Sequence, residues 1–170
     1  MKAILRNRIL AERRALSPDQ IYAFSQAIFA RVIDYLRNKP FDSVLAYYPI
    51  HNEVDTTLMF DYFWQNNKKL FLPVVKGSHL YPIAFYPNQP LVVGIHHIPV
   101  PNIVVDTSAP CPPIDVALVP CLACDTHRYR LGYGKGFYDR FLTPQILKIG
   151  LCYQFQVTET SIRRDLSLLE

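Results

Sequence analysis

Residues 114–140 have the sequence IDVALVPCLACDTHRYRLGYGKGFYDR, which joins a short apolar run to a glycine-rich loop. Residues 114–119 are almost all aliphatic, and such a run is typical of a strand that is buried on both faces of a parallel sheet. Gly132, Gly134 and Gly136 follow at alternate positions. Because glycine has no Cβ, these positions allow the backbone to approach a ligand closely. The stretch therefore predicts a buried strand followed by a loop that can hold a ligand.

The glycine-rich loop also carries positive charge. Lys135 lies inside it, and Arg130 and Arg140 lie at its two ends. Residues 137–142 can form a short helix, whose first amides favour an anion. The glycine spacing matches neither the Walker A pattern nor the dinucleotide-binding fingerprint. We interpret residues 130–140 as a phosphate cradle, and a tight turn that needs glycine only for packing is the alternative.

Hydrophobic periodicity in the rest of the chain predicts an alternation of helices and strands. Two helices, at residues 2–15 and 18–37, come first, and Ser17-Pro18-Asp19-Gln20 is a capping signal for the second. Strands are predicted at residues 43–48, 70–75, 80–86, 114–119 and 146–153, and a helix at about 57–65. Pro73 and Pro82 weaken the second and third of these strands, since proline cannot donate to a ladder. The pattern favours an α/β fold: a single three-layer domain over residues 1–170, with a mostly parallel sheet flanked by helices.

Composition and charge narrow the class of protein. Half of the 170 residues are hydrophobic and 19% are charged, as expected for a chain that folds. No apolar run reaches the roughly 18–20 residues of a membrane span, and the first residues lack the apolar centre of a signal peptide, so we expect a cytoplasmic protein. The net charge is +4, but residues 1–39 alone carry eight basic and three acidic side chains, so the rest sums to −1. This confinement argues against a nucleic-acid-binding surface spread over the protein.

The four cysteines are expected to be reduced thiols that are buried or half-buried. They are Cys111, Cys121, Cys124 and Cys152. Cys121 and Cys124 form a CxxC pair, and a zinc site with His127 as a third ligand is the alternative. Such a site would need further soft ligands, and the sequence has no second pair at matching spacing.

The loop at residues 130–140 resembles the glycine-rich signature of the 5-formyltetrahydrofolate cyclo-ligase family over about eleven consecutive positions. The resemblance extends over nearly the whole chain, through Lys2 and Arg6, Arg14-Ala15-Leu16-Ser17, Glu53-Val54-Asp55-Thr56, Val119-Pro120 and Asp125. The chain differs from the family at Cys124, where an aromatic residue is usual.

The resemblance implies an ATP- and Mg²⁺-dependent enzyme of one-carbon metabolism. The family closes the formyl group of 5-formyltetrahydrofolate onto N10, which gives 5,10-methenyltetrahydrofolate while ATP becomes ADP and phosphate. It implies ATP and 5-formyltetrahydrofolate as substrates and Mg²⁺ as cofactor, and we expect a monomer without nucleic-acid or membrane partners. An RNA-binding module and a folate-binding relative without catalysis remain alternatives.

The resemblance also implies roles for individual residues. The expected ATP-binding residues are Lys2, Arg6, Arg130, Leu131, Gly132, Tyr133, Gly134, Lys135, Gly136, Phe137 and Tyr138. Lys2 and Arg6 are four residues apart, so they share one helix face. Lys135 is the expected catalytic residue, nearest the transferred phosphoryl group.

The acidic candidates divide between folate and metal. Glu53 is expected to bind the folate near its formyl group, with Tyr48 and Tyr133 lining the same pocket. Asp139 and Asp165 are expected to bind Mg²⁺. Two of these have a structural alternative: Glu53 could cap the next helix, and Asp139 could pair with a neighbouring arginine on the surface.

Overall fold

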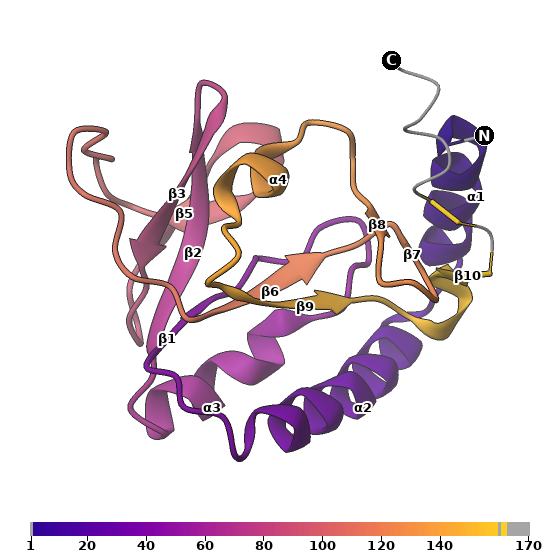
Figure 1. Cartoon of the computed structure of the whole chain (residues 1–170), viewed down its shortest axis with the longest axis horizontal. Coiled ribbons are helices and arrows are strands. Elements are labelled where there is room, and N and C mark those ends of the chain that lie inside the picture. Colours follow the sequence, from indigo (N-terminus) through magenta and orange to yellow (C-terminus); the bar gives the residue numbers. More distant parts are fainter. Residues whose placement is uncertain (1, 160, 163–170) are drawn as a thin grey trace.

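The computed structural model describes residues 2–159 and 161–162 and is built around a five-stranded sheet (Figure 1). The strand order is β3-β2-β1-β6-β9. The strands are β1 (Ser43–Leu45), β2 (Lys69–Lys76), β3 (His79–Ala84), β6 (Val116–Pro120) and β9 (Leu147–Leu151). Neighbouring pairs from β2 to β9 are parallel, and β3 runs antiparallel to β2 at one edge. The predicted α/β class with a mostly parallel sheet is confirmed.

Helices cover both faces of this sheet (Figure 1). On one face lie α2 (Pro18–Leu36), the 3-10 turn η1 (Thr56–Met59) and α3 (Phe60–Gln65), and on the other lies α4 (Phe137–Phe141). Helix α1 (Lys2–Arg14) lies to one side of this sheet, where Leu5 packs against Ala123 and Leu131. Helix α2 begins with the predicted capping box, in which Ser17 and Gln20 bond each other's backbone amides. Within the described ranges, no helix is both long and apolar enough to cross a bilayer.

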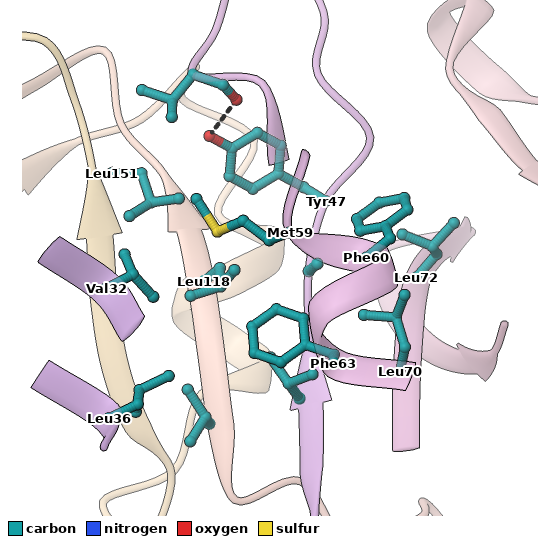
Figure 2. Packing of buried hydrophobic residues seen from close by; sticks show 14 of the residues in the cluster. Val32, Leu36, Tyr47, Met59, Phe60, Phe63, Leu70, Leu72, Leu118 and Leu151 are labelled. Carbon is teal, nitrogen blue, oxygen red and sulfur yellow. Dashed lines mark hydrogen bonds between the residues drawn. The ribbon is translucent and has the colours of Figure 1, made fainter. Parts of the chain in front are cut away.

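The core lies in two clusters, one on each face of the sheet. Figure 2 shows the larger one, where α2 contributes Val32 and Leu36 and α3 contributes Phe63. In β6, Leu118 faces this cluster, whereas Val119 faces the second cluster beneath α4. Side chains of both faces of β6 are therefore buried, which explains the continuous apolar run at this point of the sequence.

The two prolines that weakened the strand predictions occupy one rung of the β2–β3 ladder. Pro73 is directly opposite Pro82. Because both fall at the same position, they interrupt the ladder only once, and both strands extend past it. Both strands are consequently present.

Other predictions needed correction. The first strand ends at Leu45 instead of residue 48, since the chain then leaves the sheet and the buried Tyr47 hydroxyl donates to Val54 O, 3.0 Å away (Figure 2). Five short strands were not predicted. They are β4 (Leu91–Val93) and β5 (Pro99–Pro101), which form a hairpin, and β7 (Ala123–Asp125), β8 (Arg130–Leu131) and β10 (Val157–Thr158), which form a small sheet. Two or three residues are too few for a periodic pattern.

Asp115 ties the start of β1 to the start of β6. Its Oδ2 accepts hydrogen bonds from the Asp42 amide (2.8 Å), the Ser43 amide (3.0 Å) and the Ser43 hydroxyl (3.0 Å). The Asp42 bond is the largest cause that lowers the pKa of Asp115; partial desolvation opposes it, and both Ser43 bonds assist it.

Replacing Asp115 with alanine is expected to lower the free energy of unfolding by about 1 kcal/mol at neutral pH, because the lost hydrogen bonds go to a charged acceptor that solvent partly screens. Since the folded-state pKa is depressed, this contribution is present above the unfolded pKa and is lost as pH falls through the folded value. Urea unfolding of both proteins at decreasing pH measures the difference, which should shrink toward acid. Asp34→Ala, at an exposed ion pair with Arg37, is the matched control and should change little. An Asp115→Ala deficit that is independent of pH would contradict this account.

Candidate active site

A cluster of polar side chains lies beyond the carboxyl ends of three parallel strands. Glu53 follows β1, residues 121–133 follow β6, and Tyr153 follows β9. In a parallel sheet these ends meet at one edge, which is where ligands bind in open α/β folds. The sheet topology therefore brings together segments that are up to 100 residues apart, such as Tyr153, whose hydroxyl donates to Glu53 O at 2.9 Å.

Glu53 is a buried carboxylate held in a tight turn. Only 5% of the surface of this residue is exposed. Oε2 accepts from the Ile50 amide at 3.0 Å, and the Glu53 amide donates back to Ile50 O at 3.0 Å. The structure thus does not use this carboxylate to cap the following helix, since the cap of η1 is Asp55.

Arg13 binds the backbone carbonyl groups of this turn. The residue is fully buried (0% exposed) and comes from α1. Its Nε donates to His51 O at 2.8 Å, and its Nη2 donates to Ile50 O at 3.0 Å and to the Tyr133 hydroxyl at 2.9 Å. Its Nη1 is buried without a partner among the described residues. The guanidinium therefore fixes the turn against both α1 and the glycine-rich loop.

Tyr133 completes the connection between the loop and the turn. Its hydroxyl accepts from Arg13 and donates to Glu53 Oε1 at 2.9 Å, across 80 residues of sequence. Burial raises the pKa of Tyr133, and the nearby Glu53 charge raises it further, so the hydroxyl remains a donor at neutral pH. Arg13, Tyr133 and Glu53 form one hydrogen-bonded network, which we call the Arg13 network.

The pKa of Glu53 reflects two opposing effects. Burial is the larger and raises it. The Ile50 amide, the positive charge of Arg13 and the Tyr133 hydroxyl each lower it in part. The network thus favours an ionised carboxylate at a site where burial alone would favour the neutral acid.

Arg6 lies against the glycine-rich loop. Its Nε donates to Gly132 O at 3.0 Å, and a Cβ added at Gly134 would lie 3.4 Å from its Nη2. Gly134 has a φ of 92° and Gly136 a φ of 68°, in the left-handed region that favours glycine. Lys2 is half-buried one turn earlier on α1. The first helix and the loop therefore share one surface, although 126 residues separate Arg6 from Gly132.

The arginines at the two ends of the loop brace it internally. Arg130 forms an ion pair with Asp139 and lies over the Tyr138 ring, 5.7 Å from its centroid. Arg140 Nη2 donates to Lys135 O at 2.9 Å. Asp139 is therefore paired on the surface, with its side chain 72% exposed, as in the alternative considered above.

The other loop residues divide into exposed and buried groups. Lys135 is exposed, and its ammonium has no bond to any described residue. Leu131 is buried, and Phe137 and Tyr138 pack against the second core cluster. Since these three side chains serve packing, a ligand in the loop would meet their backbone instead.

Three further expectations concern Tyr48, Asp165 and the metal site. Tyr48 is half-buried and packs against the main core cluster. Asp165 lies outside the described residues. Within the described ranges, no three His, Cys, Asp or Glu side chains are arranged to hold a metal ion.

The four cysteines are free thiols, as expected. Cys121 is buried, while Cys124 and Cys152 are half-buried with their sulfurs 2.9 Å apart. The expectation of burial is wrong for Cys111, which is exposed in a proline-rich connection. Cys124 thus contacts Cys152, and the arrangement does not support zinc binding by a Cys121–Cys124 pair.

Sequence reasoning missed Arg13 as a site residue. A signal was present, because Arg13 lies one turn after Ile9 on the apolar stripe, and both are fully buried. A basic residue on the buried face of a helix must find acceptors inside the protein.

The fold and the site define an α/β protein with a buried carboxylate and a cationic glycine-rich loop at the carboxyl ends of its parallel strands. Residues 1–162 match the family model described as the 5-formyltetrahydrofolate cyclo-ligase family. The 5-formyltetrahydrofolate cyclo-ligase of Escherichia coli (strain K12) is 31% identical over 137 residues, which is 79% of this chain and 75% of that protein. The enzyme of the same name from Mycoplasma pneumoniae is 33% identical over 159 residues, 91% of this chain and 87% of that one.

Solved structures agree with the sequence comparisons. The NMR structure of Aquifex aeolicus 5,10-methenyltetrahydrofolate synthetase superposes with a TM-score of 0.77 and 34% identity, covering 95% of this chain and 82% of that one. The 5,10-methenyltetrahydrofolate synthetase structure from Mycoplasma pneumoniae has a TM-score of 0.70 and 30% identity, covering 94% and 90%. The chain belongs to the 5-formyltetrahydrofolate cyclo-ligase family, which confirms the resemblance seen in its glycine-rich loop.

Proposed function

We propose that this protein catalyses the ATP-dependent cyclisation of 5-formyltetrahydrofolate to 5,10-methenyltetrahydrofolate. Family membership supports the reaction. The observation that carries the proposal is the Arg13 network. In it, Tyr133 of the cationic glycine-rich loop is hydrogen-bonded directly to the buried Glu53 carboxylate. One substrate with an N–H donor and one with a triphosphate would be brought together at this junction.

The chemistry requires that a poor leaving group be made into a good one. The formyl oxygen is amide-like and does not leave by itself. Transfer of the γ-phosphoryl group to this oxygen activates the carbon, N10 attacks it, and phosphate departs. The protein must therefore align the phosphoryl group with the formyl oxygen and neutralise the charge that develops.

Arg6 and the loop provide the groups for ATP in this proposal. Arg6, with Lys2 one turn earlier, supplies positive charge beside the loop. The amides of residues 130–138 cradle the phosphates. Lys135 is exposed at the loop, so its ammonium is available to stabilise the transferred group.

Glu53 provides the acceptor for the folate. Its carboxylate binds an N–H next to the formyl group, and Tyr133 lines the same pocket by its direct bond to Glu53. Tyr48 follows the same strand and would line the outer part of the pocket. The Arg13 network partly offsets the effect of burial on the pKa of Glu53, and an ionised carboxylate accepts an N–H donor without a proton of its own in the way.

Asp139 is the described carboxylate that fits Mg²⁺ in this proposal. A nucleotide-bound Mg²⁺ needs one or two protein carboxylates, with phosphates and water as the remaining ligands. Asp139 lies at the end of the loop and is mostly exposed, so it can leave Arg130 for the ion. Mg²⁺ would supply charge neutralisation at the phosphates, and Asp165 is the proposed second ligand.

Absorbance of the methenyl product tests the proposed function. Purified protein, Mg-ATP and 5-formyltetrahydrofolate should give the methenyl chromophore at a rate proportional to enzyme, and omission of ATP should abolish it. A folded sample that binds folate without any ATP-dependent signal would show a binding relative instead.

We propose that the active form is a cytoplasmic monomer, and the same sample should elute from gel filtration at the size of one chain.

Replacing Arg6 with alanine is expected to raise the KM for ATP about 10- to 100-fold, because a charged hydrogen-bond donor is lost beside the phosphates. Steady-state kinetics at saturating folate measure the change. Arg8→Ala is the matched control: Arg8 lies on the same helix but pairs with Glu12 in solvent, so its loss should leave KM unchanged. Equal effects of the two substitutions would show that Arg6 acts only through the overall positive charge of the helix and not by contacting ATP.

A further inference from the structure

Cys124 and Cys152 form a close thiol pair that the proposed reaction does not use. Their sulfurs are 2.9 Å apart and hydrogen-bonded. A disulfide requires about 2.05 Å, so closing this pair needs a movement of roughly 0.9 Å.

The pair connects two parts of the fold. Cys124 lies in β7, where it pairs with Arg130 of β8 and Val157 of β10. Cys152 comes directly after β9, the edge strand of the main sheet. A bond between them would join the small sheet to the main sheet. It would also enclose residues 125–151, which include the whole glycine-rich loop.

The pair can be reached from solvent. Both cysteines are half-buried, unlike Cys121, which is buried. Cys152 lines an open hollow between α2 and β9, together with Tyr35 and the cation of Arg31. A small anionic disulfide could therefore approach Cys152 through this hollow, with its carboxylates near Arg31 and the half-buried Cys124 sulfur 2.9 Å from that of Cys152.

The environment assigns different roles to the two thiols. The hydrogen bond between the two sulfurs lowers the pKa of Cys124, against desolvation and the charge of Asp125. For Cys152, the hydrogen bond with Cys124 and burial both raise the pKa. Cys124 is thus the better thiolate, and Cys152 is the neighbour that can resolve a mixed disulfide.

We propose that Cys124 and Cys152 are a reversible redox site that exchanges with low-molecular-weight disulfides such as glutathione disulfide. The Cys124 thiolate attacks one sulfur of glutathione disulfide, which breaks the S–S bond, forms a mixed disulfide and releases one glutathione thiolate. Cys152 then attacks the Cys124 sulfur and releases the second. The protein dithiol is oxidised by two electrons, and one glutathione disulfide is reduced to two thiols, with both protein protons transferred to them.

Mass spectrometry of the full chain tests this proposal. After incubation with glutathione disulfide, the protein should lose two hydrogen atoms and two of its four titratable thiols, and a digest should contain Cys124 and Cys152 in one linked peptide pair. Dithiothreitol should reverse all three changes. The oxidised protein should unfold about 5–15 °C higher than the reduced protein, because the cross-link restricts the unfolded chain.

Variants provide the controls. Cys111→Ala removes the exposed thiol and should leave the linked peptide unchanged, whereas Cys152→Ser should stop the reaction at a glutathione adduct on Cys124. Four remaining thiols, a lasting glutathione adduct on the wild-type protein, or a link to Cys111 or Cys121 would each overturn the proposal. Because the decisive readout uses the wild-type protein, it does not depend on whether a variant folds.

Discussion

Replacing Lys135 with alanine is expected to lower kcat for methenyltetrahydrofolate formation about 10²- to 10³-fold, the usual cost of one lost donor at a site of developing charge. The ammonium of Lys135 is exposed and makes no bond to any described residue, so the substitution should not change stability. Steady-state kinetics with saturating ATP and folate measure kcat, and thermal unfolding checks the fold. The effect should fall mainly on kcat, because the cation is proposed to act on the transferred phosphoryl group.

Lys69→Ala is the matched control for this experiment. Lys69 is an exposed lysine at the start of β2, which lies at the opposite end of the parallel strands from the loop. Its replacement should leave kcat and KM within twofold of wild type. If Lys135→Ala keeps full turnover, Lys135 has no part in the mechanism, although the proposed reaction itself would stand.

Replacing Arg13 with methionine is expected to lower the free energy of unfolding by about 3–5 kcal/mol, because a fully buried charged donor is lost and Glu53 loses the nearby positive charge that lowers its pKa. Two carbonyl oxygens and the Tyr133 hydroxyl also lose their donor. Urea unfolding measures the loss. Arg14→Ala, an exposed neighbour on the same helix, is the control and should change stability little.

The pH dependence of the same variant separates positioning from simple stability. The charge of Arg13 lowers the pKa of Glu53, so its removal raises that pKa further. The acidic limb of kcat/KM for folate should consequently move to higher pH in Arg13→Met. A further Glu53→Gln substitution should restore part of the lost stability, since it removes the buried charge. An unchanged acidic limb would show that Arg13 does not act through Glu53.

Much of the fold could be predicted from local patterns. The helix at Pro18–Leu36 has its own capping residues, and β6 has an apolar run that only burial on both faces explains. The small sheet could not be predicted in this way. Its strands have two or three residues each, and they form because distant segments pair, such as Val157 with Cys124.

The amino-acid sequence by itself determined the fold class, the glycine-rich loop and the family, because each depends on residues close together in the chain. Only the tertiary structure decided which charged groups form the candidate site. Arg13 resembles its exposed neighbours in sequence, yet it is buried against Ile50, His51 and Tyr133, which are 37, 38 and 120 residues away. The ionisation of Glu53 depends on that contact as well as on its own burial. The apolar stripe of α1 indicates that Arg13 is buried, but its partners come from segments far apart in sequence, and no local pattern identifies them.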